Sequence, residues 1–254
     1  MSSGIQSVEL AYRVLSVLQA SSGPVNLKHI ALGAAMSPSK ARMYLVSLIR
    51  TGLVRQNAAS GAYMLGVSAL SLGQAASRQT DVHLPARALM QALAQDVQAP
   101  TMLSSWNGSQ VMIIERSEGG DGLPIDFRIG GSVSLTRTAT GRVALARMDL
   151  ALAARRISAD LQASTSAHLV AGTLAGFHEY LAQVRERGYD SASEVVLGSD
   201  PSIRLAGLGA VGLPVLDPLD QLRFVITVLF RTTTPDNDRA TIDLIVARAR
   251  GLTA

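Results

Sequence analysis

The stretch that decides the fold is Asn26–Val54, NLKHIALGAAMSPSKARMYLVSLIRTGLV. It predicts a short helix, a tight turn over 33–36 and a longer helix that stops at Gly52. Ser37 suits the N-cap of the longer helix, and Pro38 suits its first position, where a missing backbone N–H costs nothing. A helix pair of this kind is how many proteins place a helix in the major groove of DNA. The stretch therefore predicts sequence-specific DNA binding.

The longer helix has two different faces. Ala41, Leu45 and Leu48 form one apolar stripe, which we expect to face a core. The opposite face is basic and carries serines, and an outward Met43 or Val46 on it suits contact with thymine methyl groups and base edges. The alternative is an ordinary amphipathic helix of a bundle. We expect the DNA-contacting residues to be Ser37, Ser39, Lys40, Arg42, Met43, Ser47, Arg50 and Arg55.

The charge of the chain is concentrated in its first third. The whole chain carries a formal charge of +4, but residues 1–80 have seven Lys and Arg against Glu9 alone, a charge of +6. The remainder has 16 basic and 18 acidic residues, a charge of −2. A compact basic segment is typical of a partner that is a polyanion, because each cation placed on a phosphate releases a counterion. A basic surface that is merely solvated is the alternative.

Two short strands are expected directly after the longer helix. Leu53–Gln56 and Ala62–Leu65 flank a polar turn, which predicts a β-hairpin that would act as the wing of a winged helix. Arg55 and the turn Asn57–Gly61 are candidates for contact with phosphate or the minor groove. A small sheet that only completes the core is the alternative, and we expect Tyr63 to pack there. Upstream, residues 6–20 predict a helix with a wide apolar face.

Length and composition exclude several classes of protein. The chain has 254 residues, which at about 150 residues per domain indicates one or two domains. No apolar run reaches the length of a membrane span, and the start lacks the pattern of a secretion signal, so we expect a cytoplasmic protein. There is no cysteine, and the four histidines show no metal-ligand spacing. We therefore predict no catalytic residues, no metal and no cofactor.

Residues 81–254 alternate between strand and helix signals. Helices are expected from Pro85 to about Val97, over 140–148, 151–157 and 174–187 with a stop at Gly188, and after the cap Thr234. Strands are expected at TMLSSW (101–106), QVMIIER (110–116), PIDFRI (124–129), 208–216 and 221–230. This pattern predicts an α+β fold in which a sheet is covered by helices and is large enough to hold a pocket.

Several segments resemble one family in colinear order. SVELAYRVLSVL, NLKHIA, SPSKARMYLVSLIRTGLV and GAYMLGVSALSLG are similar to the winged helix of IclR-type transcriptional regulators. LTRTATGRVALARM (135–148), VRERGYDSASE (184–194) and GLGAVGLPVLDPLDQLRFVITV (207–228) resemble the later segments of that family. The winged helix alone fits several regulator families; the order of the later segments makes the resemblance specific.

The resemblance implies a domain organisation and partners. It implies a winged helix-turn-helix DNA-binding domain at 1–66, a linker helix at 67–80 and a GAF-like effector-binding domain at 81–254. It further implies a homodimer or homotetramer that binds a palindromic operator in double-stranded DNA and responds to a small organic acid. In the linker helix, Val67, Leu70 and Leu72 are candidates for dimer packing.

The resemblance also implies an effector pocket. In the family, backbone N–H groups at a small-residue turn hold the carboxylate of an acid, and a helix N-terminus provides such donors. The turn corresponds to Ala139 and Thr140, with hydroxyl donors expected from Thr138 and Thr140. Ala192 and Ala210 stand where relatives often carry acidic and cysteine residues, which favours an aromatic or larger apolar acid. The expected effector-binding residues are Thr138, Ala139, Thr140, Gly141, Leu208, Ala210, Thr227 and Leu229.

Two other functions stay open at this point. One is a small-molecule sensor that acts through protein contacts, and the other, with less support, is a metabolic enzyme. Loss of DNA retention after substitution of Lys40 or Arg42 by alanine distinguishes a regulator from such a sensor. Turnover of a metabolite would indicate the enzyme.

Overall fold

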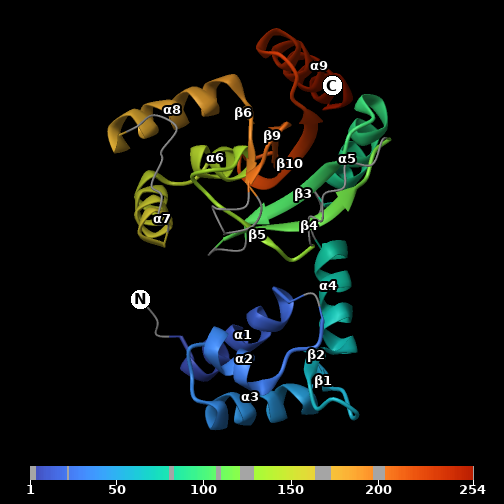
Figure 1. Ribbon diagram of the computed structural model, residues 1–254, viewed down its shortest axis with the longest axis vertical. Helices are drawn as coiled ribbons and strands as arrows, with labels where there is room; N and C mark the ends of the chain where they lie inside the picture. Colours follow the sequence, from blue (N-terminus) through green and yellow to red (C-terminus); the bar gives the residue numbers. More distant parts are fainter. Residues whose placement is uncertain are drawn as a thin grey trace. The chain divides into compact units, whose positions relative to one another are not determined.

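The computed structural model describes residues 4–21, 23–79, 83–106, 110–120, 129–163, 173–196 and 204–253. The chain divides into two compact units, Met1–Asp81 and Val82–Ala254, and each mixes helices with an antiparallel sheet (Figure 1). Residues 124–128 of the expected strand PIDFRI lie outside the described residues. Within the described part of the chain, no helix is both long enough and apolar enough to cross a membrane.

The first unit contains the predicted helix pair and hairpin. Its elements are α1 (Gln6–Gln19), α2 (Leu27–Gly33), α3 (Pro38–Arg50), β1 (Val54–Gln56), β2 (Tyr63–Leu65) and α4 (Val67–Gln79). Local caps fix where the helices begin. The side chain of Asn26 accepts from the His29 backbone N–H at 3.0 Å, and that of Ser37 accepts from the Lys40 N–H at 3.3 Å. Both caps confirm the sequence interpretation.

The core of the first unit is small and lies between α1, α2, α3 and the two strands. It consists of Val14, Leu18, Ile30, Ala34, Leu45, Leu48, Val54 and Tyr63. Tyr63 is buried, which confirms its predicted packing role. Its backbone also pairs with Val25 through two hydrogen bonds of 2.8 Å, so the segment before α2 adds a third strand position to the hairpin. The sequence interpretation did not include this pairing.

The wide apolar face predicted for residues 6–20 is buried only in part. Val14 and Leu18 are buried in the core, whereas Val8 is 63% exposed. Tyr12 on the same helix and Ile5 at its N-cap are exposed as well. The core of this unit contacts α1 from Ala11 onward, so the apolar positions of its first turn remain on the surface.

The second unit is built on a six-stranded antiparallel sheet with the order β5-β4-β3-β10-β9-β6. Its strands are β3 (Thr101–Trp106), β4 (Val111–Ser117), β5 (Ser132–Val133), β6 (Asp190–Ala192), β9 (Leu208–Leu216) and β10 (Leu222–Arg231). A separate pair is formed by β7 (Val195–Val196) and β8 (Arg204–Leu205). The helices are α5 (His83–Val97), α6 (Ala139–Ala146), α7 (Leu150–Ala163), α8 (Leu174–Arg187) and α9 (Pro235–Thr253).

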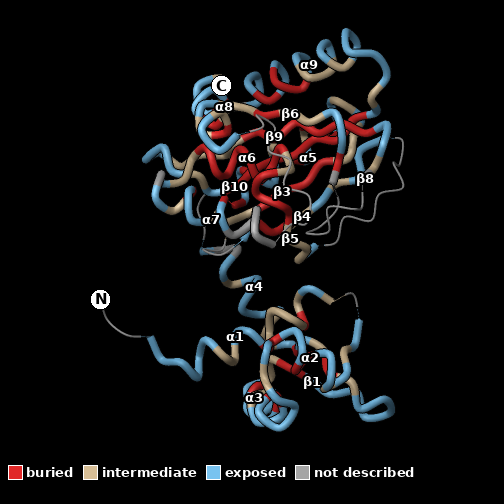
Figure 2. The backbone as a smooth tube through the Cα atoms, turned by 60° about the vertical axis from the view of Figure 1, so that its left-hand side comes forward, coloured by how far each residue is buried: buried red, intermediate tan, exposed pale blue. Residues whose placement is uncertain are grey.

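Helices cover both faces of this sheet. α5 and α9 pack on one face in a core that includes Leu103, Val211 and Ile226. α6, α7 and α8 pack on the other face in a core that includes Val143, Ile157 and Phe177. Figure 1 shows the two helix layers, and Figure 2 shows that the central strands are the most buried part of the unit. Because successive side chains of a strand point to opposite faces, β9 and β10 contribute to both cores.

Most predicted element boundaries in this unit lie within a few residues of those observed. The helix expected at 140–148 occupies Ala139–Ala146, because Thr138 is its N-cap. The helix expected at 151–157 is longer and covers Leu150–Ala163. α8 ends at Gly188, whose φ of 80° is the left-handed conformation that glycine adopts without strain, as predicted.

Candidate DNA interface and effector pocket

The outer face of α3 presents the predicted DNA-contacting residues to solvent. Ala41, Leu45 and Leu48 are buried and Tyr44 is half-buried beside them, whereas the other positions of the helix are exposed. Met43 is 72% exposed and Val46 is 42% exposed. The other predicted residues of this helix and its cap are exposed too: Ser37, Ser39, Lys40, Arg42, Ser47 and Arg50. A long apolar side chain standing among cations on an exposed helix suits the floor of a major groove.

Two serines of this face also have local roles. The Ser37 oxygen caps α3 and lies 3.1 Å from the hydroxyl oxygen of Ser39. The Ser47 hydroxyl donates to the Met43 carbonyl at 3.3 Å, a bond within the helix. Cation side chains and Met43 are therefore the main groups of α3 that project freely toward a groove.

The hairpin after α3 is held by its own hydrogen bonds. The side chain of Asn57 accepts from the backbone N–H groups of Ala59 and Ser60, at 2.9 and 3.1 Å. The side-chain amide of Gln56 donates to the Gly61 carbonyl at 2.7 Å. Arg55 is exposed on β1. A turn fixed in this way presents its backbone in one conformation, which suits contact with a phosphate or a groove edge.

A close backbone approach sets the hairpin against the end of α3. Gly52 adopts a φ of 72° directly after the helix. A Cβ atom on Gly66 would lie 2.1 Å from the Gly52 carbonyl oxygen, so only glycine fits at position 66. The Gly66 backbone N–H also donates to the Leu53 carbonyl at 2.8 Å. This contact fixes the place where β2 leaves the hairpin and α4 begins.

In the second unit, a pocket lies where α6 begins. Among the described residues it is lined by Met102, Val133, Thr138, Ala139, Thr140, Ala192, Glu194, Val195, Ala210 and Thr227. Its volume is about 20 Å³, which is room for about one water molecule. Five of the eight expected effector residues line it: Thr138, Ala139, Thr140, Ala210 and Thr227.

The N-terminus of α6 offers two backbone donors to this pocket. Ala139 and Thr140 are buried, and their N–H groups have no acceptor among the described residues. The N–H of Gly141 is already used, because it donates to the Thr138 side chain at 2.9 Å. Buried N–H groups at the start of a helix, with the positive end of its dipole, suit an anion.

The expected donor role of Thr138 is corrected by the structure. Its hydroxyl donates its only proton to the Ser134 carbonyl at 2.7 Å while accepting from Gly141. Thr140 has a different partner, the Thr227 hydroxyl, whose oxygen lies 2.7 Å away. One of these two hydroxyls donates its proton to the other. The hydroxyl that accepts keeps its own proton, which is available to a ligand.

Two glycines allow this turn to sit close to its surroundings. A Cβ atom on Gly141 would lie 2.2 Å from the Ser134 carbonyl oxygen. One on Gly212, in β9, would lie 3.0 Å from the Ala139 oxygen and 3.2 Å from the Thr140 nitrogen. Gly141 is therefore a packing residue of the site. Gly212 acts in the same way, and its role was missed because the approach joins segments that are far apart in the sequence.

Three expected residues lie outside the lining of the pocket. Gly141 packs beneath the turn, and Leu208 and Leu229 are buried in the core on the same face of the sheet. Conversely, Met102, Val133 and Val195 line the pocket without having been singled out. Glu194 brings a carboxylate to the lining, which makes this pocket less apolar than Ala192 and Ala210 alone suggested. Met102 lies on the expected strand TMLSSW, whereas no strand was expected at Val133, which lies on β5.

A buried ionic cluster lies behind the pocket. The carboxylate of Asp190, fully buried at the start of β6, accepts from Arg142 at 2.5 Å, from the Tyr180 hydroxyl at 2.5 Å and from Arg187. Arg142 is buried in α6 and also donates to the Ser191 carbonyl at 3.2 Å. Burial and the neighbouring Asp190 carboxylate raise the pKa of Tyr180 above its ordinary value. The cluster ties α6, α8 and β6 together.

Comparison with known proteins identifies the class. A winged helix-turn-helix unit and a separate sheet unit with a pocket define the architecture of a ligand-responsive DNA-binding protein. The IclR helix-turn-helix domain matches residues 7–58, and the bacterial transcriptional regulator IclR C-terminal domain matches residues 74–241. The chain therefore belongs to the IclR family of bacterial transcriptional regulators, so it is a DNA-binding regulator and the enzyme alternative is set aside.

Individual relatives agree over most of the chain. The probable transcriptional regulator SauR of Cupriavidus necator is 26% identical over 81% of this chain and 78% of its own length. The regulator XynR of Escherichia coli is 28% identical over 75% of each. The crystal structure of an IclR regulator from Alicyclobacillus acidocaldarius, 24% identical, covers 98% of both chains with a TM-score of 0.77. An IclR homologue from Microbacterium hydrocarbonoxydans, solved with 4-hydroxybenzoate, covers 97% of both chains at 17% identity and a TM-score of 0.69.

Proposed function

We propose that this regulator binds a palindromic operator through α3 and its wing, and that a small organic acid controls this binding. The observation that carries the DNA part is the exposed cationic face of α3, with Met43 projecting from it. Lys40, Arg42 and Met43 read base edges, and Arg50 and Arg55 contact phosphates. The winged-helix domain comprises residues 1–66, the linker helix 67–80 and the effector domain 81–254.

Selection of bound sequences from random DNA tests the operator. The expected product is an inverted repeat whose half-sites are separated by about 34 Å or a multiple of it, one helical turn of DNA. Arg42→Ala should then cost about 1–3 kcal/mol on the selected site and relax its sequence preference. Arg55→Ala should weaken all sequences alike and reduce the salt dependence. Unchanged affinity and preference for Arg42→Ala would remove α3 from the proposed readout.

The operator's symmetry requires a symmetric protein, and we propose a homodimer. Exposed apolar residues of the first unit lie at the start of α1 and on α4: Ile5, Val8, Tyr12, Val67, Leu70 and Leu72. Val67 and Leu70 are three residues apart, so they share one face of α4 that a partner would cover. Sedimentation of the wild type and of Leu70→Glu tests this, since a charge at a buried interface should favour the monomer. A second association to a tetramer would appear as a further, heavier species.

For the effector we propose an aromatic or larger apolar acid. Its carboxylate accepts from the N–H groups of Ala139 and Thr140, and its apolar part contacts Met102, Val133 and Ala210. Ala192 and Ala210 leave an apolar surface where larger polar side chains would restrict a ring. The Glu194 carboxylate at the rim favours a ligand that carries a hydroxyl donor at its far end. Because the pocket now admits about one water, binding requires the wall to open.

Calorimetric titration with four acids tests this assignment: glyoxylate, pyruvate, benzoate and 4-hydroxybenzoate. The two aromatic acids should bind more tightly than the two small keto acids. In Glu194→Ala, the difference in affinity between 4-hydroxybenzoate and benzoate should become smaller. Tight binding of glyoxylate with no binding of either aromatic acid would refute the ligand class. Such a result would leave the DNA-binding function intact.

A further inference from the structure

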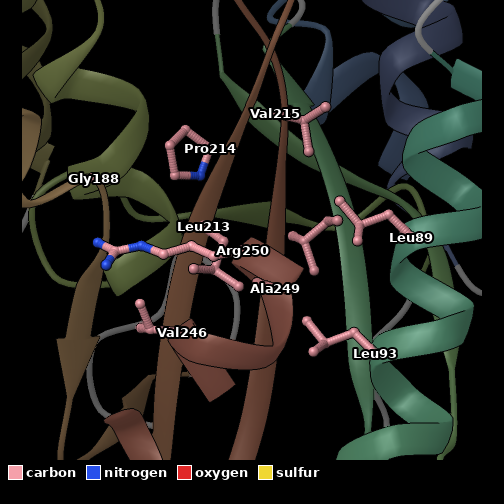
Figure 3. A pocket seen from close by; sticks show the side chains of 10 residues that line it. Leu89, Leu93, Gly188, Leu213, Pro214, Val215, Val246, Ala249 and Arg250 are labelled. Carbon is pink, nitrogen blue, oxygen red and sulfur yellow. The ribbon is translucent and has the colours of Figure 1, made fainter. Parts of the chain in front are cut away.

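A second cavity lies on the opposite face of the same sheet. It is bounded by α5, α9, β9 and β10 (Figure 3) and has a volume of about 120 Å³. Its apolar wall is formed chiefly by Leu89, Leu93, Leu213, Ile226, Val246 and Ala249. The cavity is half open to solvent, and the fully buried side chains of Leu93 and Ile226 lie beneath its floor.

The size of this cavity suits a small apolar group. Enclosed apolar cavities of about 150 Å³ in other proteins bind benzene, so a half-open cavity of this volume has room for a group of similar size. The wall around this one offers aliphatic side chains from both helices and both strands. A chain or ring of roughly six carbon atoms would therefore fill it and gain contacts that water cannot provide.

The edge of the cavity is polar and cationic. Gly188, at the end of α8, and Arg250, in the last turn of α9, complete the lining. The Arg250 guanidinium donates to the Arg187 carbonyl at 3.3 Å, which holds the side chain beside Gly188 (Figure 3). A guanidinium presents several donors, so it can bind a carboxylate while it keeps that hydrogen bond.

We propose that this cavity is a second ligand site, specific for a small aliphatic carboxylic acid. The hydrocarbon chain lies between α5 and α9, and the carboxylate meets Arg250 at the edge. The site is distinct from the pocket at α6, because the two lie on opposite faces. They are nevertheless adjacent through the sheet: Ile226 lines this cavity, and its neighbour Thr227 lines the other.

Hexanoate is the probe that tests the proposal, with hexan-1-ol and hexylammonium as matched ligands of the same length. We expect hexanoate to bind the full-length protein and the other two to bind at least threefold more weakly. Arg250→Gln should lower the affinity for hexanoate by about tenfold, which is the usual effect of losing a hydrogen bond to a charged group. Arg248→Gln, on the exposed side of the same helix, is the matched control and should leave the affinity unchanged.

The position of the ligand is measured independently of its affinity. Magnetisation transfer from the hexanoate methyl group should reach the methyl groups of Leu93 and Ile226. Ala249→Leu should abolish hexanoate binding, because the larger side chain fills the cavity. If Ala249→Leu does not fold, Arg250→Gln still tests the site, because Arg250 is exposed. Transfer to Met102 and Val133 instead, or hexylammonium binding as tightly as hexanoate, would overturn the proposal. Absence of hexanoate binding would overturn it too, while leaving the α6 pocket unaffected.

Discussion

The Nε atom of Arg142 lies 2.5 Å from a carboxylate oxygen of Asp190, and both side chains are buried. Arg142 follows the turn of the proposed effector site by two residues, and Asp190 precedes the pocket residue Ala192 by two. The ion pair therefore fixes two walls of the pocket relative to each other. Each partner has hydrogen bonds beyond the pair, which is what a buried ion pair needs in order to offset the cost of desolvation.

Removal of the negative partner should be strongly destabilising. We expect Asp190→Ala to lower the free energy of unfolding by about 3–5 kcal/mol, because the Arg142 charge stays buried without its partner. Urea unfolding followed by circular dichroism measures this loss. The control is Glu118→Ala, which removes a carboxylate that is 80% exposed and lies 3.5 Å from Arg116, and it should cost much less. Equal losses for the two variants would mean that burial adds nothing to the Arg142–Asp190 pair.

Tyr180 gives the same cluster a pH dependence. Burial, followed by the nearby Asp190 carboxylate, raises the pKa of Tyr180 above its ordinary value of 10.0. The neutral hydroxyl donates to Asp190, so its contribution to stability is complete below pH 10 and is lost as the pH rises through the folded-state pKa. Absorbance titration of the phenolates should show a late phase above pH 10 that Tyr180→Phe removes. Tyr12→Phe, in the other unit, should leave this phase in place.

Gly212 should be sensitive to the addition of a single methyl group. In Gly212→Ala the new Cβ would lie 3.0 Å from the Ala139 oxygen and 3.2 Å from the Thr140 nitrogen, both backbone atoms. The turn would have to shift by a few tenths of an ångström, which misplaces the two N–H donors. We expect affinity for benzoate to fall by about tenfold, equivalent to ~1.4 kcal/mol, in a calorimetric titration. Gly251→Ala, whose Cβ would meet no atom within 4 Å, is the control and should bind benzoate like the wild type.

Local interactions are the part of this structure that the sequence predicts well. The caps at Asn26, Ser37 and Thr234 and the stops at Gly52 and Gly188 depend on neighbouring residues only, and they lie where the pattern placed them. The outward face of α3 follows from helical periodicity, because the buried stripe determines which side remains. Fold class follows in turn from the order of these elements.

Contacts between distant segments are the part that the pattern does not contain. The pairing of Val25 with Tyr63 depends on how the hairpin meets the segment before α2. The approach of Gly212 to Ala139 depends on strand register and on how α6 packs, and neither is encoded in local spacing. For the same reason the donor role expected of Thr138 was wrong. Its capping role is local, but the Ser134 carbonyl that takes its proton could not be identified beforehand.

Two glycines of the first unit offer the sharpest contrast between crowded and open positions. A Cβ on Gly66 would lie 2.1 Å from the Gly52 oxygen and 3.2 Å from the Val54 carbonyl carbon, whereas one on Gly73 would meet nothing within 4 Å. Gly66→Ala should therefore displace the hairpin from the end of α3 and destabilise the unit. Gly73→Ala lies inside α4 and should stabilise that helix by up to about 1 kcal/mol, the propensity difference between the two residues.

Thermal unfolding and DNA binding measure both effects in the same pair of variants. The midpoint of unfolding should fall for Gly66→Ala and rise slightly for Gly73→Ala. Affinity for the selected operator, measured by fluorescence anisotropy at a temperature where both variants are folded, should fall for Gly66→Ala because Arg55 and the wing turn lose their position relative to α3. Operator affinity that survives in folded Gly66→Ala would show that the wing is not needed for binding, and that α3 alone carries the contact.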